Sequence, residues 1–368
     1  MDDLRTMINQ INLTSPIQNN RFLISADQWT INRAELFNIV YPNGPLTTGV
    51  DIVQLNYDYV AAGIANIPEC AQMSYYTINN PGGRGGGGTP QYQYLLYPHN
   101  PIGVLMVWLC GHTGWLNYRT DDEAFTIQRF LDEGWHVLVI PMPAFNYQTN
   151  PNPHQYILTG GAWANIGGTW NNIGGTLVDY YEHSYSGLLD GGPNPNRMFG
   201  DQFRRATNQA ISEINSSALL LGGHSGGGSS GNIAAALDDR YQCWYACCPG
   251  TPYNISLVPT NSIDWESYLL NDIYTNPPTA YDEWGLLTVA SAINGRRSAV
   301  VSAVTDEYFP LTPNNIPIWL ADTEQIGALI ETTGATWTYR LEYGGIAQHR
   351  MTTSRLDWII NDINTNVL

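Results

Sequence analysis

A serine set among glycines is the residue in this chain with the clearest potential for chemistry. The stretch 219–231 reads LLLGGHSGGGSSG, and residues 223–227 within it satisfy the pattern G-x-S-x-G. An apolar run, 218–221, precedes this turn and a helix-like run, 232–237, follows it, so the pattern predicts a sharp turn between a strand and a helix. Glycine is expected beside a serine on such a turn, because the strained backbone is crowded on both sides. The stretch therefore predicts a nucleophile elbow that presents Ser225.

A serine hydroxyl is a poor nucleophile near neutral pH unless a base takes its proton. The base is expected to be a histidine whose tautomer is fixed by a carboxylate. In parallel α/β sheets the catalytic groups lie at the carboxyl ends of strands. Two residues after Ser225 meet this requirement, since Asp306 follows the apolar run AVVSAV and His349 follows TWTYRLEY, just before the last predicted helix. We therefore predict Asp306 as the acid and His349 as the base.

Other residues compete for both roles. Glu307 is adjacent to Asp306, and Asp322 follows IPIWL, which we interpret as the next strand. Six further histidines compete with His349. Of these, His224 belongs to the elbow pattern, where its side chain is expected to point away from the serine. The remaining five precede the elbow in the chain.

With these residues the chain resembles the α/β-hydrolase family, which shows the same chain order of serine, acid and histidine. The resemblance covers about residues 70–368. It implies an α/β fold with a mostly parallel central sheet flanked by helices. The family often has its acid in a D-x-x-hydrophobe-P setting, and residues 306–310 read DEYFP, with one extra residue.

The resemblance also implies an oxyanion hole built from backbone N–H groups. One donor is Gly226, directly after the serine. The second is His112 or Thr113, in the loop CGHTGW that follows the first buried parallel strand. The family often has a histidine where this chain has Cys110, so the choice between these two donors stays open.

The order of predicted elements agrees with this fold. The runs AQMSYYTI and QYQYLLYP predict two antiparallel strands. GVLMVWL, a helix and HVLVIPMP follow with short joints, which predicts a βαβ unit with parallel strands. The helix is predicted to begin with a capping box formed by Thr120 and Glu123.

The domain organisation is predicted as one catalytic domain with additions. Residues 1–69 form an N-terminal extension packed on the catalytic domain, 70–368. Two lid-like insertions, at about 145–200 and 251–297, interrupt the pattern, as long connections with few periodic signals often do at functional loops. Aromatic side chains in or near the first insertion are candidates for substrate binding, with attachment of the insertion to the domain body as the equal alternative. These candidates are Trp115, Trp163 and Trp170.

Composition excludes several functions. The formal net charge is -17, which argues against nucleic acid as a partner. All 15 basic residues are arginine, so lysine-dependent chemistry such as a Schiff base is excluded. The five cysteines are irregularly spaced and are interpreted as core thiols rather than metal ligands. The first residues show neither a signal peptide nor a membrane span. A reducing compartment such as the cytoplasm fits these thiols, and release by another route or delivery in a virion stays open.

The predicted activity is that of a serine-dependent carboxylic-ester hydrolase acting through an acyl-enzyme. The machinery needs neither a metal nor an organic cofactor. The expected partner is a small-molecule or polymer ester, and the sequence leaves its identity and the oligomeric state open. Two alternatives remain: a serine peptidase of the same fold, and a non-catalytic binding or virion structural module that retains the fold.

Overall fold

The computed structural model describes sixteen parts of the chain. They are residues 33–34, 36–38, 41, 44, 49–57, 68–80, 89–111, 121–141, 155–157, 162–166, 169–173, 177–179, 195–250, 283–306, 311–343 and 349–368. Within them, no helix combines the length and the apolar character that crossing a membrane requires.

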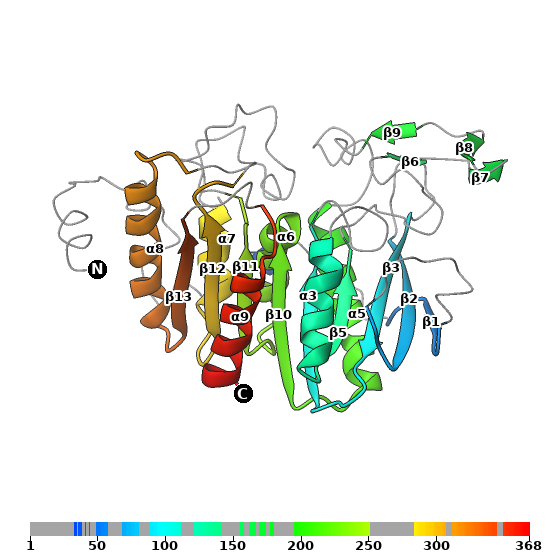
Figure 1. The fold of residues 1–368 in the computed structure, drawn as a ribbon, viewed down its shortest axis with the longest axis horizontal. Helices are drawn as coiled ribbons and strands as arrows, with labels where there is room; N and C mark the ends of the chain where they lie inside the picture. The colour runs from blue at the N-terminus through cyan, green and yellow to red at the C-terminus, as the bar shows by residue number, and fades with distance from the viewer. Residues whose placement is uncertain are drawn as a thin grey trace.

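A nine-stranded sheet forms the centre of the molecule, with the strand order β1-β2-β3-β5-β4-β10-β11-β12-β13 (Figure 1). The strands of this sheet are β1 (Ile52–Gln54), β2 (Gln72–Asn80), β3 (Thr89–Tyr97), β4 (Val104–Leu109), β5 (His136–Ile140), β10 (Ala218–His224), β11 (Cys243–Cys247), β12 (Arg297–Ala303) and β13 (Thr336–Glu342). The six strands from β5 to β13 pair in parallel. β1, β2 and β3 form an antiparallel edge, as the predicted pair AQMSYYTI and QYQYLLYP required. The sheet is therefore mostly parallel, and the predicted fold class is confirmed.

Helices cover both faces of this sheet. Figure 1 shows α3 and α9 in front of it, and on the opposite side α5 and α7 both pack against α6. α8 packs against the edge strand β13. The helices are α3 (Asp121–Asp132), α5 (Pro195–Glu213), α6 (Gly226–Leu237), α7 (Glu283–Ser291), α8 (Ile316–Glu331) and α9 (Thr353–Asn366).

The two central strands show why the sequence folds this way. Every residue of β4 and of β10 is buried, because helices cover both sides of these strands. Continuous apolar runs such as VLMVWL are the sequence signature of strands in that position. β4, α3 and β5 form the predicted βαβ unit, and β4 and β5 are parallel. The turn after α3 is made at Gly134, whose φ of 80° lies in the left-handed region that favours glycine.

The described residues of the N-terminal segment contact the same core. β1 pairs with β2, which extends the sheet by one strand. Leu36 and Tyr41 are buried in the main hydrophobic cluster. The Arg205 guanidinium on α5 donates two hydrogen bonds to the carbonyl of Gly49 and lies 3.0 Å from a carboxylate oxygen of Asp51. The predicted boundary at residue 69 stays a prediction.

One predicted strand is wrong. IPIWL, residues 316–320, forms the first turns of α8 rather than a strand that ends at Asp322. Pro317 lies in the first turn of this helix, where its missing N–H costs nothing and its fixed φ suits helical backbone. The buried side chains of α8 recur at helical spacing through Trp319, Thr323, Ile326 and Ile330. Asp322 therefore lies in the middle of a helix and not at the end of a strand.

The two predicted insertions are described only in small part. In the first, β6 (Gln155–Ile157) pairs with β9 (Leu177–Asp179), and β7 (Ala162–Ile166) pairs with β8 (Thr169–Ile173). β7 and β8 hold the two similar sequences AWANI and TWNNI, which face each other as antiparallel partners. In the second, EWGLLTVAS forms α7, and residues 251–282 lie outside the described parts. A lid function for either insertion stays a prediction.

Candidate active site

The order of strands in the sheet defines where a site is expected. After β4 the chain continues to β5 on one side, and it later returns to β10 on the other side of β4. Connections that leave two neighbouring strands in opposite directions open a crevice at the carboxyl ends of these strands. Gly111 lies just past the end of β4, and Ser225 directly follows β10. The predicted nucleophile therefore lies at this switch point.

The backbone of Ser225 is strained in the way that an elbow requires. Its φ is 55° and its ψ is -124°, a conformation that residues other than glycine rarely adopt. Ser225 is the N-cap of α6, yet its hydroxyl makes no capping hydrogen bond. Serine at this position usually accepts from an N–H of the first helical turn. The sharp turn instead aims the hydroxyl out of the helix, so that it is free to meet a base.

Close backbone packing holds this turn in place. A Cβ atom added to Gly227 would lie 2.1 Å from the carbonyl oxygen of Leu109, which no side chain tolerates. The start of α6 therefore packs directly on the end of β4. The N–H of Ser225 donates to the carbonyl of Cys247 at 2.9 Å, which ties the elbow to β11 as well.

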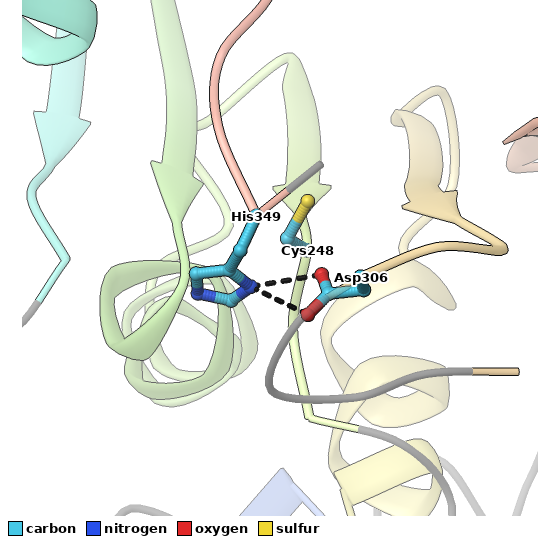
Figure 2. A group of neighbouring side chains, drawn as sticks. All are labelled: Cys248, Asp306 and His349. Carbon is cyan, nitrogen blue, oxygen red and sulfur yellow. Dashed lines mark hydrogen bonds and ion pairs between the residues drawn. The ribbon is translucent and has the colours of Figure 1, made fainter. Parts of the chain in front are cut away.

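The structure brings the predicted acid and base to this serine. His349 Nε2 lies 2.6 Å from Ser225 Oγ, and His349 Nδ1 lies 2.8 and 3.0 Å from the two carboxylate oxygens of Asp306 (Figure 2). The side chains of His349 and Asp306 are 7% and 3% exposed. With Asp306 ionised, Nδ1 carries the proton and donates a hydrogen bond to the carboxylate. This leaves Nε2 to accept a hydrogen bond from the serine hydroxyl. This chain of hydrogen bonds is the geometry of a Ser-His-Asp triad.

Cys248 lies next to this group, and its surroundings explain why we assign no metal site there. Its sulfur, the Asp306 carboxylate and His349 Nδ1 lie within 4.8 Å of one another. However, Arg355 Nη1 donates to the Cys248 sulfur at 2.9 Å, which places a cation on the group that a metal ion would need. Figure 2 shows this sulfur directed away from the contact between Asp306 and His349. The cysteines of the described parts, Cys248 included, are free thiols.

Of the predicted oxyanion donors, Gly226 lies within the described residues. Gly226 is the first residue of α6, and N–H groups in the first turn of a helix have no partner within it. They also lie at the positive end of the helix dipole, which favours a developing negative charge. The other predicted donors, His112 and Thr113, lie outside the described residues.

The remaining predicted site residues are not placed by the structure. Trp115 and the competing acid Glu307 lie outside the described residues. Trp163 and Trp170 lie on β7 and β8, and their side chains are likewise outside the description. Their role in substrate binding stays a prediction.

One buried polar side chain in this region was not predicted as part of the site. The sequence predicts a capping box between Glu123 and Thr120, which lies outside the described residues. The structure shows the Glu123 carboxylate 1% exposed and bonded to Trp108, Gly111 and His224. A signal was present in the sequence, because Glu123 falls on the same helical face as Ile127 and Phe130, which are buried. A carboxylate on an apolar face indicates a buried partner.

Comparisons with known proteins establish the fold of this chain. No family model matches the sequence, and no curated protein sequence matches it significantly. Among solved structures, an acetyl xylan esterase from Paenibacillus sp. R4 is 15% identical with a TM-score of 0.52, over 100% of this chain and 99% of that one. A glucuronoyl esterase from Solibacter usitatus is 11% identical with a TM-score of 0.54, over 94% and 95%. Acetyl xylan esterase 1 from Thermoanaerobacterium sp. is 13% identical with a TM-score of 0.53, over 92% and 94%. The chain therefore has the α/β-hydrolase fold.

Proposed function

We propose that this protein is a serine-dependent carboxylic-ester hydrolase. The observation that carries the proposal is the continuous chain of hydrogen bonds from Ser225 through His349 to Asp306, on a strained turn at the switch point of the sheet. A serine in this setting has both a base to take its proton and a carboxylate to stabilise the resulting imidazolium. Ser225 is partly exposed, so a substrate carbonyl can approach the hydroxyl.

In the proposed acylation step, Ser225 Oγ attacks the ester carbonyl while its proton passes to His349 Nε2. The carbonyl oxygen becomes an oxyanion that accepts a hydrogen bond from the Gly226 N–H, with a second donor expected from the loop that follows Gly111. The tetrahedral intermediate collapses when the C–O bond to the alcohol breaks. His349 returns its proton to this alcohol, which leaves the acyl group on Ser225.

In the proposed deacylation step, water replaces the alcohol. His349 takes a proton from the water, the hydroxide attacks the acyl carbon, and a second tetrahedral intermediate forms. Its collapse releases the carboxylic acid, and Ser225 recovers the proton from His349. Protein groups and water supply each step, so the proposed reaction requires no cofactor.

Ester substrates are favoured over peptides because the three structural neighbours described above are acetyl xylan esterases and a glucuronoyl esterase. These names suggest acyl or uronoyl esters of carbohydrates as the first substrates to test. A peptidase of the same fold would use the same triad, so the distinction has to come from turnover of paired ester and amide substrates.

A fluorophosphonate probe tests the proposal directly, because it reacts with an activated serine. We expect a single adduct on the peptide that contains Ser225, and loss of this adduct in Ser225→Ala. Wild-type protein is also expected to hydrolyse 4-nitrophenyl acetate, and Ser225→Ala to lose this activity while its circular dichroism is unchanged. A non-catalytic binding module would show neither labelling nor turnover.

The Ser229→Ala variant provides a matched control. The Ser229 hydroxyl accepts a hydrogen bond from the Gly250 N–H, which gives it a structural role inside α6. Ser229→Ala should keep both the label and turnover within a few fold of wild type. Labelling at Ser229, or hydrolysis that survives Ser225→Ala, would contradict the assignment of the nucleophile.

A further inference from the structure

Glu123 is a buried carboxylate that the triad does not use. It is 1% exposed on the inner face of α3. Its Oε2 accepts from the Trp108 indole N–H at 2.6 Å, and its Oε1 lies 3.2 Å from both the Gly111 N–H and His224 Nδ1. An ionised carboxylate in the interior is costly unless such donors compensate it. The three contacts join the end of β4, the elbow and α3 through one side chain.

Two of these donors flank the nucleophile. His224 is the residue directly before Ser225. Gly111 packs against Ser225 from the other side, since a Cβ atom added to Gly111 would lie 2.9 Å from Ser225 Cβ and 3.5 Å from Ser225 Oγ. Gly111 is also the residue directly before the loop that holds the predicted oxyanion donors His112 and Thr113. The Glu123 carboxylate thus holds the base of this loop beside the nucleophile.

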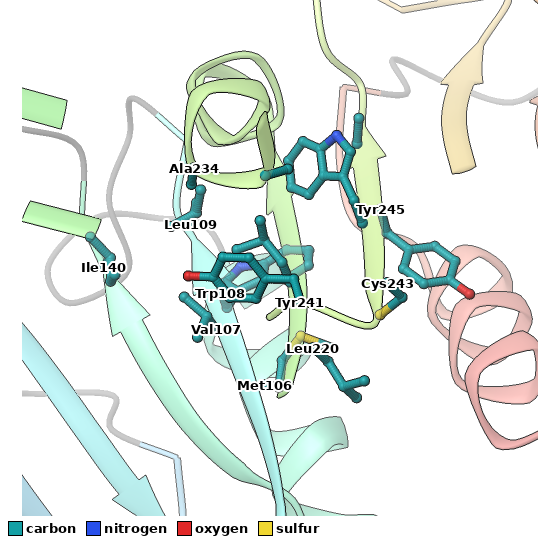
Figure 3. Close-up of a cluster of buried hydrophobic side chains, with 14 of the residues drawn as sticks. Met106, Val107, Trp108, Leu109, Ile140, Leu220, Ala234, Tyr241, Cys243 and Tyr245 are labelled. Atoms are coloured by element: carbon teal, nitrogen blue, oxygen red, sulfur yellow. The ribbon is translucent and has the colours of Figure 1, made fainter. Parts of the chain in front are cut away.

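The third donor anchors the carboxylate to the protein core. Trp108 is fully buried in the main hydrophobic cluster, and Figure 3 shows its ring among the side chains of β4 and its neighbours. Such a ring cannot shift without opening a cavity. The hydrogen bond from Trp108 therefore fixes the Glu123 carboxylate on one side. Its other hydrogen bonds in turn restrain Gly111 and His224.

The charges around His224 favour an ion pair with Glu123. Burial would lower the pKa of His224, but its interactions with Cys248 and Glu123 outweigh burial and raise this pKa to about 10. The His349 ring faces the His224 ring at a centroid distance of 5.2 Å, and Arg355 donates to Cys248 from behind. The Glu123 carboxylate at Nδ1 therefore favours the protonated form of the His224 ring.

We infer that Glu123 is a positioning residue for the proposed reaction. Its carboxylate ties the Gly111 peptide and the His224 side chain to the core, and so sets the distance between the base of the oxyanion loop and Ser225. This inference rests on the proposed function. Because oxyanion stabilisation acts in the transition state, loss of this tie should lower kcat and leave KM nearly unchanged.

Glu123→Gln is the first variant to test. Glutamine keeps the shape, but its NH₂ group would face a donor where the carboxylate offers an acceptor. We expect kcat for 4-nitrophenyl acetate to fall on the order of 10- to 100-fold, with KM changed less than about threefold, as misplacement of a positioning group does. We also expect a changed pH profile of kcat/KM, because His224 loses the carboxylate that favours its protonated form.

Asp362→Asn is the matched control. Asp362 on α9 is a partly buried carboxylate with several donors, among them Tyr245 and Arg297. It bonds the first residue of β12, at the amino end of the strand, whereas the proposed site lies at the carboxyl ends. Asp362→Asn should reduce stability and leave kcat and its pH profile as in wild type. If Glu123→Gln behaves in the same way, Glu123 has a structural role only and the inference is wrong.

Two variants of His224 keep the inference testable if Glu123→Gln does not fold. His224→Ala removes the donor to Glu123 and should lower kcat as Glu123→Gln does. His224→Asn offers an amide N–H near the position of Nδ1 and should recover much of this loss. Equal kcat values for His224→Ala and wild type would overturn the inference.

The same measurements separate this inference from the proposed function. Wild-type protein that lacks both turnover and fluorophosphonate labelling would overturn both. Wild-type turnover that depends on Ser225, together with unchanged kcat in Glu123→Gln and His224→Ala, would overturn the positioning role alone.

Discussion

His349 Nε2 lies 2.6 Å from Ser225 Oγ, although the two residues are 124 positions apart in the sequence. The sheet produces this contact, because Ser225 follows β10 and the segment of His349 follows β13 at the same edge. α9 begins four residues after His349, and the Thr352 side chain caps it by accepting from the Arg355 N–H. The base is therefore held between the last strand and a capped helix.

The role of the acid is tested by Asp306→Asn. Asparagine keeps the shape but no longer fixes the proton on His349 Nδ1, nor does it stabilise the imidazolium. Turnover of 4-nitrophenyl acetate should fall about 10³- to 10⁴-fold, as it does when a triad acid is neutralised. Glu307→Gln is the matched neighbour and should change turnover far less. A larger loss of turnover in Glu307→Gln would assign the role of the acid to Glu307 instead of Asp306.

The close contact between α6 and β4 is tested by Gly227→Ala. The new methyl group would lie 2.1 Å from the Leu109 carbonyl oxygen and 2.6 Å from that of Cys110, so the elbow has to move. We expect a loss of about 1–3 kcal/mol or more in the free energy of unfolding, together with loss of esterase activity. Gly49→Ala is the control, since its Cβ atom would meet only Gln209 Oε1 at 3.7 Å. Denaturant unfolding of both variants checks this, and equal stability would argue against the tight contact.

The hydrogen bonds of the buried Arg296 guanidinium are tested by Arg296→Lys. This guanidinium is 1% exposed and donates to the carbonyls of Tyr241, Ala235, Ala290 and Asp238. A lysine ammonium has three donors and no planar fork, so Arg296→Lys leaves at least one carbonyl without a donor. Each such carbonyl costs about 1–3 kcal/mol.

The comparison for this prediction is Arg240→Lys, at an exposed ion pair with Asp238. Surface pairs contribute about 0–1 kcal/mol, so this variant should unfold nearly as wild type does. Thermal or denaturant unfolding separates the two variants. Arg296→Lys with wild-type stability would show that the carbonyls find other donors.

The pH dependence of stability is tested at Asp362. Burial would raise the pKa of Asp362, but hydrogen bonds from Arg297 and Tyr245 outweigh it and lower this pKa below its ordinary value. A lowered pKa in the folded state adds stability above the unfolded value of about 3.9, and this stability is lost as the pH falls through the folded value. Asp362→Asn should therefore be less stable than wild type by about 1–3 kcal/mol at pH 7.

The difference in unfolding free energy between wild type and Asp362→Asn should narrow as the pH falls below about 4. Urea unfolding at a series of pH values measures it. Asp357→Asn is the control, because Asp357 forms a half-exposed ion pair with Arg129. A difference for Asp362→Asn that stays constant from pH 7 to below pH 4 would contradict the prediction.

The amino-acid pattern alone predicts the order of most elements and the three residues of the hydrogen-bonded group. The runs around β4, β5 and β10 are continuous and apolar because these strands are covered on both faces, and that pattern is visible in the sequence. Ser225 follows from its glycines, and Asp306 and His349 follow from their positions at the ends of β12 and β13. These inferences succeed because strand ends converge at one edge of a parallel sheet.

The partners of the buried polar groups follow only from the folded chain. IPIWL has no periodicity that separates a short strand from the start of a helix, and its packing against β13 settles the choice. The Glu123 carboxylate and the Cys248 sulfur have local positions that predict a helix cap and a core thiol. Their actual partners, His224 and Arg355, lie 101 and 107 positions away in the sequence. Hydrogen bonds over such separations depend on how the strands are ordered in space, and this order exists only in the folded chain.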